Sequence, residues 1–129
     1  MVDVNKPLPV LPGAIPFTSR AVMCGEKVTV IAPSLVVFKP RRLTLLSSTA
    51  ECFSLVKLSL IQREGVECVI FSSQPNHPLF NGGFFTSNLA PVILPFSTAR
   101  SGDEYRLTVL NHTGTNVYLT AMLEGLYAD

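Results

Sequence analysis

The sequence is short of the residues that catalysis and metal binding use most. It has no tryptophan, three cysteines and two histidines, His77 and His112. No Cys-x-x-Cys pair occurs, whereas a zinc site needs about four convergent ligands at characteristic spacings. Both histidines lie in turn-rich stretches, which favours exposed turn residues over catalytic bases. We therefore expect no catalytic residue, no cofactor and no metal, and we predict that the protein is not an enzyme.

Charge is also scarce. Charged residues make up 15% of the chain, against about 25% in an average domain, and the formal net charge is +1. The chain as a whole therefore has no field that would attract nucleic acid or an anionic membrane. No apolar run approaches the ~20 residues of a membrane-spanning helix, so we expect no membrane span.

The cysteines indicate where the chain is made. Cys24, Cys52 and Cys68 are odd in number and widely spaced, which predicts three reduced thiols packed as small apolar side chains. The N-terminal residues lack the uninterrupted apolar run of a secretory signal. We expect synthesis in a reducing cytoplasm.

What the sequence has in quantity is apolar residues, 47% of 129 residues, enough for one domain with a real core.

Prolines at positions 7, 9, 12 and 16 exclude a helix or a central strand at the N-terminus. We predict an extended, proline-rich arm over residues 1–17 and a single domain over residues 18–129. Apolar residues on such an arm need a surface to cover. The arm residues expected in an interface are Leu8, Val10, Leu11, Ile15 and Phe17.

From residue 18 onward the hydrophobic period is close to two, as in half-buried strands. The pattern is strongest over 27–30, 53–62 and 117–124, and a change of alternation between Leu55 and Val56 predicts a β-bulge or a strand that changes its packing partner. No segment has a helical period over ten residues. Eight or nine short strands separated by turns indicate an all-β, antiparallel β-sandwich.

Two hairpins and one edge strand are expected within this pattern. Residues 53–62 pair with 67–71, Asn111–Thr115 closes a second hairpin, and residues 91–96 form an edge strand bounded by prolines. Residues 72–87 read as a long loop that contains Phe80, Phe84 and Phe85. Three phenylalanines in a loop either plug the end of the core or face a partner, so we add them to the expected interface.

One basic cluster stands out, formed by Lys39, Arg41 and Arg42. It is a candidate contact for nucleic acid or another polyanion. Three cations give only weak non-specific binding, because affinity grows with the number of phosphates neutralised. A solvated loop or an interface with salt bridges is the alternative interpretation.

The proline arm, the series of about eight strands and the apolar loop together resemble single jelly-roll structural proteins of viruses. Residues 38–55 and 109–125 are similar to segments of small β-rich virion proteins. The resemblance implies a jelly-roll-like fold and a virion location. It also implies a capsid, vertex or decoration subunit that assembles with copies of itself or packs against other shell proteins. It carries over no catalytic residue.

Two other functions are alternatives for a fold of this class. A jelly-roll binding module would recognise a glycan or a protein receptor, with Tyr105, Tyr118 and Tyr127 as candidate sugar contacts. The absence of tryptophan removes the strongest stacking platform for a sugar. A cupin-like enzyme would need clustered histidine and glutamate ligands on its strands, which this sequence does not supply.

Overall fold

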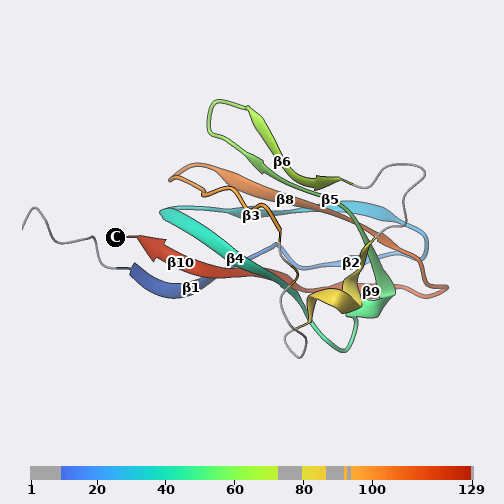
Figure 1. Ribbon diagram of the computed structural model, residues 1–129. Coiled ribbons are helices and arrows are strands. Elements are labelled where there is room, and N and C mark those ends of the chain that lie inside the picture. Colours follow the sequence, from blue (N-terminus) through green and yellow to red (C-terminus); the bar gives the residue numbers. More distant parts are fainter. Residues whose placement is uncertain (1–9, 73–79, 87–91, 93, 129) are drawn as a thin grey trace, which may run out of the picture.

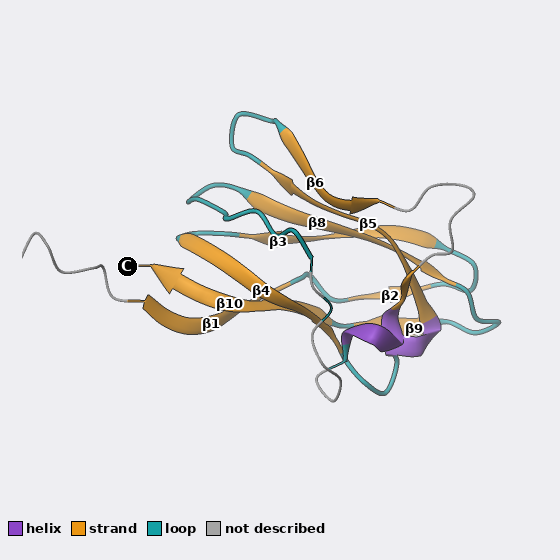
Figure 2. Ribbon diagram, viewed as in Figure 1, coloured by secondary structure: helices purple, strands orange, loops and turns teal. Residues whose placement is uncertain are grey.

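The computed structural model describes residues 10–72, 80–86, 92 and 94–128. Figure 1 shows two layers of antiparallel strands facing each other. This arrangement confirms the prediction of an all-β, antiparallel sandwich. Within the described residues the helical pieces are two short 3₁₀ turns, η1 (Ala50–Cys52) and η2 (Gly82–Phe85), which lie together at one end of the molecule (Figure 2).

The upper layer in Figure 1 is a five-stranded sheet, in which the order is β3-β8-β5-β6 and the short strand β7 also pairs with β5. The lower layer is a three-stranded sheet with the order β1-β10-β4, and β2 and β9 form a separate pair. The strand bounds are β1 Val10–Pro16, β2 Arg20–Val22, β3 Lys27–Pro33, β4 Val37–Leu45, β5 Phe53–Ile61, β6 Glu67–Ser72, β7 Phe80–Asn81, β8 Glu104–Asn111, β9 Val117–Leu119 and β10 Ala121–Ala128.

The strands pair in a nested order along the chain. The first two strands pair with the last two, β1 with β10 and β2 with β9. β3 pairs with β8, and β4 is bridged to the segment before β8 through Phe38 and Ala99. The innermost pair is the β5–β6 hairpin. These pairs are therefore nested, from the ends of the described chain inward to the β5–β6 hairpin.

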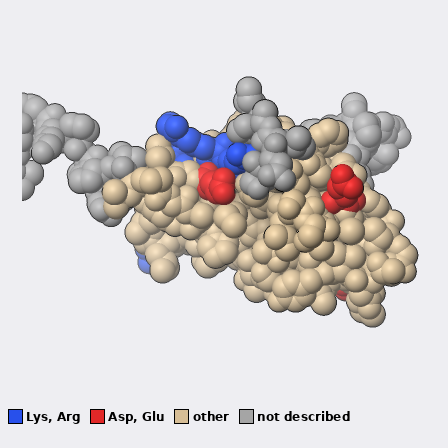
Figure 3. All heavy atoms as spheres, turned by 90° about the horizontal axis from the view of Figure 1, so that it is seen from below, with Lys and Arg blue, Asp and Glu red and all other residues tan. Residues whose placement is uncertain are grey.

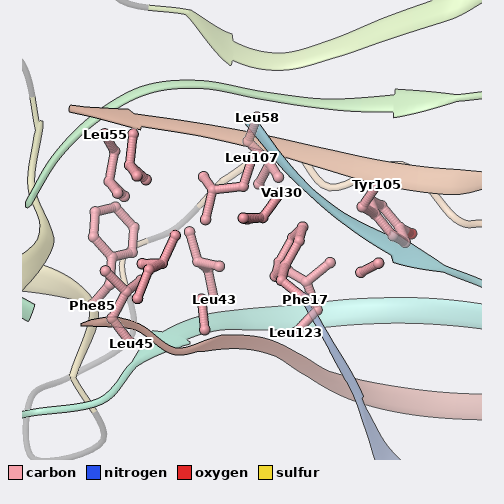
Figure 4. Packing of buried hydrophobic residues seen from close by; sticks show 14 of the residues in the cluster. Phe17, Val30, Leu43, Leu45, Leu55, Leu58, Phe85, Tyr105, Leu107 and Leu123 are labelled. Atoms are coloured by element: carbon pink, nitrogen blue, oxygen red, sulfur yellow. The ribbon is translucent and has the colours of Figure 1, made fainter. Parts of the chain in front are cut away.

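The core lies between the layers and follows from the two-residue period of the strands. Figure 4 shows Leu43 and Leu123 from the lower sheet pointing toward Val30, Leu58 and Leu107 from the upper sheet. Each of these side chains is buried. At ~25 cal/mol per Å² of apolar surface removed from water, such a leucine contributes about 2 kcal/mol.

The bulge predicted near Leu55 is confirmed and explains the local change of pattern. The register of β5 against β8 shifts between Leu55 and Lys57, which leaves Val56 as the extra residue. Strict alternation would send Leu55 and Leu58 to opposite faces. Because of the extra residue, both side chains are buried in the core.

Two expectations about pairing are wrong. Asn111–Thr115 does not close a hairpin, because β8 pairs with β3 and β5 whereas β9 pairs with β2. The chain instead crosses between layers at this turn. The side chain of Asn111 fixes the crossing by donating hydrogen bonds to the carbonyl oxygens of Val22 (3.1 Å) and Thr115 (2.8 Å).

The edge strand expected over residues 91–96 is not formed by its described members. Residues 91 and 93 lie outside the described residues, and residues 94–98 have no strand pairing. The sheet contact is made a few residues later, where the backbones of Phe38 and Ala99 exchange two hydrogen bonds of 2.9 Å. Proline at position 95 fits this outcome, because it cannot donate to a ladder.

Candidate functional site

The expected N-terminal arm is, in its described part, a strand of the domain itself. β1 pairs in register with β10 from Val10–Ala128 to Pro16–Met122. Ile15 and Phe17 are buried in the core of their own chain. This corrects their assignment to an interface, because the β-pairing turns these two side chains inward. It also moves the start of the domain back from residue 18 to at least residue 10.

The remaining arm residues have different positions. Leu11 is about half exposed on β1 and stays available to a partner. Val10 begins β1, and the structure does not describe its side chain. Leu8 lies outside the described residues.

The three loop phenylalanines also separate. Phe85 is buried and closes one end of the core (Figure 4), so it is a core residue and not an interface residue. Phe84, its neighbour in η2, is 59% exposed and remains a candidate contact. Phe80 lies in β7 and pairs with Leu55, but its side chain is not described. Phe85 thus plugs the end of the core, whereas contact of Phe84 with a partner stays a prediction.

The most distinctive surface is the outer face of the β1-β10-β4 sheet, which we call the lower face. Figure 3 looks directly at it and shows a broad area without charged groups, with basic residues gathered at one side. The alternation of β10 places Met122, Glu124 and Leu126 on this face, because Leu123 between them points into the core. Their partners on β1 are Pro16, Ala14 and Pro12, which add further apolar area.

The basic cluster lies on the lower face because of a second bulge. The register of β4 against β10 shifts between Glu124 and Gly125, so that Arg42 pairs with Glu124 while Lys39 pairs with Leu126. Lys39 and Arg42 are three residues apart and would occupy opposite faces in a regular strand. The extra residue, Arg41, puts them on the same face.

Gly125 makes this second bulge sterically feasible. A Cβ at position 125 would stand 2.1 Å from the carbonyl oxygen of Lys39 and 2.8 Å from Cα of Pro40. Only glycine allows the two backbones to approach this closely. The bulge leaves Lys39 and Arg41 exposed, whereas Arg42 is half-buried and donates from Nη2 to the carbonyl oxygen of Thr86 at 2.8 Å. Of the three predicted polyanion contacts, two are therefore free to meet a partner and one is used to hold a loop.

A hollow of about 260 Å³ opens on the lower face between β4 and β10. Met122 and Leu46 line it, and Thr44 is another lining residue. Thr44 is only 7% exposed, and its Oγ1 has no hydrogen-bond partner in the part of the chain that the structure describes. A buried hydroxyl without a partner costs about 1–3 kcal/mol. A neighbouring chain seated in this hollow would offer the missing partner.

A second hollow, of about 280 Å³, lies beside β1 and the loop between β3 and β4. Its lining is apolar and includes Pro16, Leu35, Val36 and the ring of Tyr127. Leu35 is 84% exposed, the highest value among the large apolar residues described. Neither hollow was predicted from the sequence; for the second, an apolar run such as residues 35–38 does not by itself show that its first three residues are exposed.

The candidate sugar contacts do not form a common site. Tyr105 is buried in the core and donates its hydroxyl to the carbonyl oxygen of Ser97 at 2.7 Å, and burial raises the pKa of its hydroxyl. Tyr127 packs on Phe38, with the ring centroids 5.0 Å apart. Tyr118 alone is exposed. The three side chains therefore do not line one concave surface.

The groups with catalytic chemistry are likewise dispersed. His77 lies outside the described residues, and His112 accepts or donates a 2.8 Å hydrogen bond between its Nδ1 and Oγ of Ser54. A serine–histidine pair acts as a nucleophile only when a third group orients the imidazole and an oxyanion site faces it. Among the described residues no carboxylate contacts this pair, and no three metal-ligating side chains converge. Cys24, Cys52 and Cys68 are all free thiols.

Comparison with known proteins adds no relative: no family model matches the chain, and no curated protein matches it. Within the ranges that the structure describes, no helix has the length and apolar character needed to cross a bilayer. The physical features of the lower face therefore carry the functional argument.

Proposed function

We propose that this protein is a non-enzymatic structural subunit of a virus shell, a jelly-roll domain that assembles through its lower face. The nested pairing of the strands supports the jelly-roll assignment. A jelly roll is a wrapped antiparallel ribbon in which first and last strands pair, then second and second-last, in two four-stranded layers. The strands of this chain follow that order: β1 pairs with β10, β2 with β9, β3 with β8 and β5 with β6, and β4 is bridged to Ala99.

The observation that carries the assembly proposal is the chemistry of the lower face. A largely apolar sheet face with a hollow between β4 and β10, a buried hydroxyl without a partner in the described chain and the exposed Leu46 has the character of an interface and not of a solvated surface. The opposite face of the sandwich carries ion pairs and a pair of hydroxyl groups beside the exposed Ile31 and Val69. The occupants would be further copies of this chain or other shell proteins.

The exposed cations beside this area give the proposed interface a polar rim. Lys39 and Arg41 stand at the border of the apolar area, where acidic side chains of a neighbour or the phosphates of a packaged nucleic acid would meet them. Repetition of the cluster on every copy of a shell would strengthen such a contact, since each copy adds its own cations.

The decisive experiment is to place a charge at the centre of the lower face. Met122→Asp is expected to leave a folded chain that no longer forms particles or higher oligomers, measured by light scattering and electron microscopy. The matched control is Thr108→Asp, at a half-buried outward position of the opposite sheet. Equal assembly of the Met122→Asp variant and the wild type would overturn the proposal.

A glycan array on the isolated chain tests the alternative of a receptor-binding module. A specific glycan bound by the isolated chain, together with no assembly at any concentration, would favour that alternative.

A further inference from the structure

The free edges of the two sheets are protected to different degrees. In β1 the N–H of Phe17 donates to the carbonyl oxygen of Ala121 at 3.0 Å. The direction of the backbone N–H and C=O groups alternates along a strand. Those of Ile15 and Gly13 therefore also point to β10, whereas those of Pro12, Ala14 and Pro16 point away from it, toward the free edge. Proline has no N–H, so Ala14 is the only donor among these three outward residues. β1 is therefore a poor template for another strand.

Two further edges are closed by the chain itself. Beside β3, the N–H of Thr18 donates to the carbonyl oxygen of Ile31 at 2.9 Å. Beside β4, Phe38 and Ala99 exchange two backbone hydrogen bonds. A strand approaching either of these edges would meet a segment that already occupies it.

The outer edge of β6 has neither protection. The N–H of Gln62 donates to the carbonyl oxygen of Val66 at 2.8 Å, so Val66 faces β5 and the backbones of Glu67 and Val69 face outward. No described residue pairs with these outward groups, and β6 contains no proline. Val66 and Val69 are 55% and 52% exposed. Figure 1 shows β6 as the outermost strand of its layer.

We propose that β6 pairs with β6 of a second copy of this chain in an antiparallel, two-fold arrangement. An added strand must bring its own free donors and acceptors, and β6 is the described edge of this chain that supplies them, at Glu67 and Val69 before its bulge at Ile70. β1 of a second copy would bring an edge with two of its donors missing. Pairing is thus restricted to β6 with β6, which closes on itself as a dimer and does not propagate into a fibre.

The charges on β6 select the register. In such a pair, residues whose backbone groups point away from β5 must lie opposite each other. Within the part of β6 before the bulge at Ile70, Glu67 therefore lies opposite either Glu67 or Val69 of the partner subunit. Two carboxylates directly opposite each other repel. The pairing of Glu67 with Val69 of the partner subunit avoids this repulsion and forms about four backbone hydrogen bonds.

This register places the two-fold axis at Cys68. Cys68 then faces Cys68 of the partner subunit as a non-hydrogen-bonded pair, with the Cα atoms about 4.5 Å apart. That separation lies within the range that a disulfide can bridge. Cys68 is a free, partly exposed thiol that accepts a weak hydrogen bond from Nε2 of Gln62. It therefore serves as a native reporter of the pairing.

The test measures the mass of the chain by light scattering and its cross-linking by diamide, which takes two electrons and two protons from a pair of thiols. We expect a dimer that diamide cross-links in a variant retaining only Cys68, and no cross-link in Cys68→Ser. Val69→Pro removes an outward N–H that the β5 ladder does not use, and we expect it to give a monomer. Val69→Lys is a second variant, in case the proline disturbs the strand.

The matched control is Ile31→Lys, which puts the same charge on the same sheet face three strands away. It is expected to remain dimeric. A wild-type chain that is monomeric at every concentration would overturn the proposal, as would a dimer that both Val69 variants leave unchanged or that cross-links through Cys24 or Cys52. The dimer does not depend on the lower face, so Met122→Asp is expected to keep it, and failure of one proposal leaves the other testable.

Discussion

The outer faces of the two sheets are built from the same alternation of side chains but differ in chemistry. On the β3-β8-β5-β6 face, charges occur in pairs: Nζ of Lys57 lies 2.7 Å from Oε1 of Glu67, and Nη2 of Arg106 lies 3.0 Å from Oε1 of Glu104. Hydroxyl groups are also paired, with 2.8 Å between Oγ1 of Thr29 and Oγ1 of Thr108. On the lower face, Thr44 has a buried hydroxyl without a partner in the described chain.

The difference indicates which surface the chain leaves in water. Exposed ion pairs contribute little to stability but keep a sheet face soluble. A largely apolar face gains free energy when another surface covers its apolar area, even though it carries Glu124 and has cations at its border. The comparison therefore assigns solvent to the outer face of the upper sheet and partners to the lower face, whereas the proposed β6 pairing uses the edge of the upper sheet and not its face.

The largest expected effect separates the two sides of a single strand. Leu123→Ala on the inner side of β10 removes a fully buried side chain and should lower the free energy of unfolding by about 2–5 kcal/mol. Met122→Ala, one residue away on the lower face, should cost about 1 kcal/mol or less in the monomer while weakening assembly. Urea denaturation combined with light scattering measures both quantities. Similar losses of stability from the two variants would remove the distinction between core and lower face.

The next largest effect on stability is expected at Gly125, in the bulge that places Lys39 and Arg42 on the same face. Gly125→Ala forces a Cβ against the backbone of Lys39 and Pro40, and we expect a loss of about 1–3 kcal/mol. Gly114→Ala is the matched control, because a Cβ there meets no atom within 4 Å, and its cost should stay within about 0.5 kcal/mol. Thermal unfolding followed by circular dichroism distinguishes the two. Equal melting temperatures would show that the bulge does not need glycine at this position.

The sequence predicted those parts of the fold that depend on neighbouring residues. Alternation located most strands, and a change in alternation located the bulge at Val56. The β5–β6 hairpin was predicted because Glu64-Gly65 lies between two clear strand patterns, and Gly65 adopts the positive φ of 92° that its turn requires. A local signal sufficed because the paired strands are adjacent in the chain.

Features that depend on distant strands were not predicted. The turn at Asn111–Thr115 has hairpin chemistry, but the choice of β2 as the partner of β9 depends on the ends of the whole ribbon. The prolines of β1 were interpreted as a free arm, whereas they occupy its outward positions and leave Ile15 and Phe17 to face the core. The shared face of Lys39 and Arg42 depends on Gly125 in another strand, so the sequence of β4 alone could not predict it.

The smallest effect tests whether the charge pairs of the upper face matter to folding. The hydrogen bond from Lys57 is the main cause that holds the pKa of Glu67 below its ordinary value of 4.5; desolvation opposes it, and the positive charge of Lys57 and a hydrogen bond from Ser59 add to the lowering. A carboxyl group with a lowered pKa in the folded state stabilises the fold at pH values above 4.5, and this contribution is lost as the pH falls through the lowered pKa. Glu67→Gln should therefore be slightly less stable than the wild type at pH 7 and equal to it at pH 2. Urea midpoints at both pH values measure the difference, with Glu51→Gln, an exposed carboxyl in η1, as the control. A difference in urea midpoint that persists unchanged at pH 2 would mean that Glu67 stabilises the fold through packing. The upper face would then be stabilised by side-chain packing and not by its ion pairs.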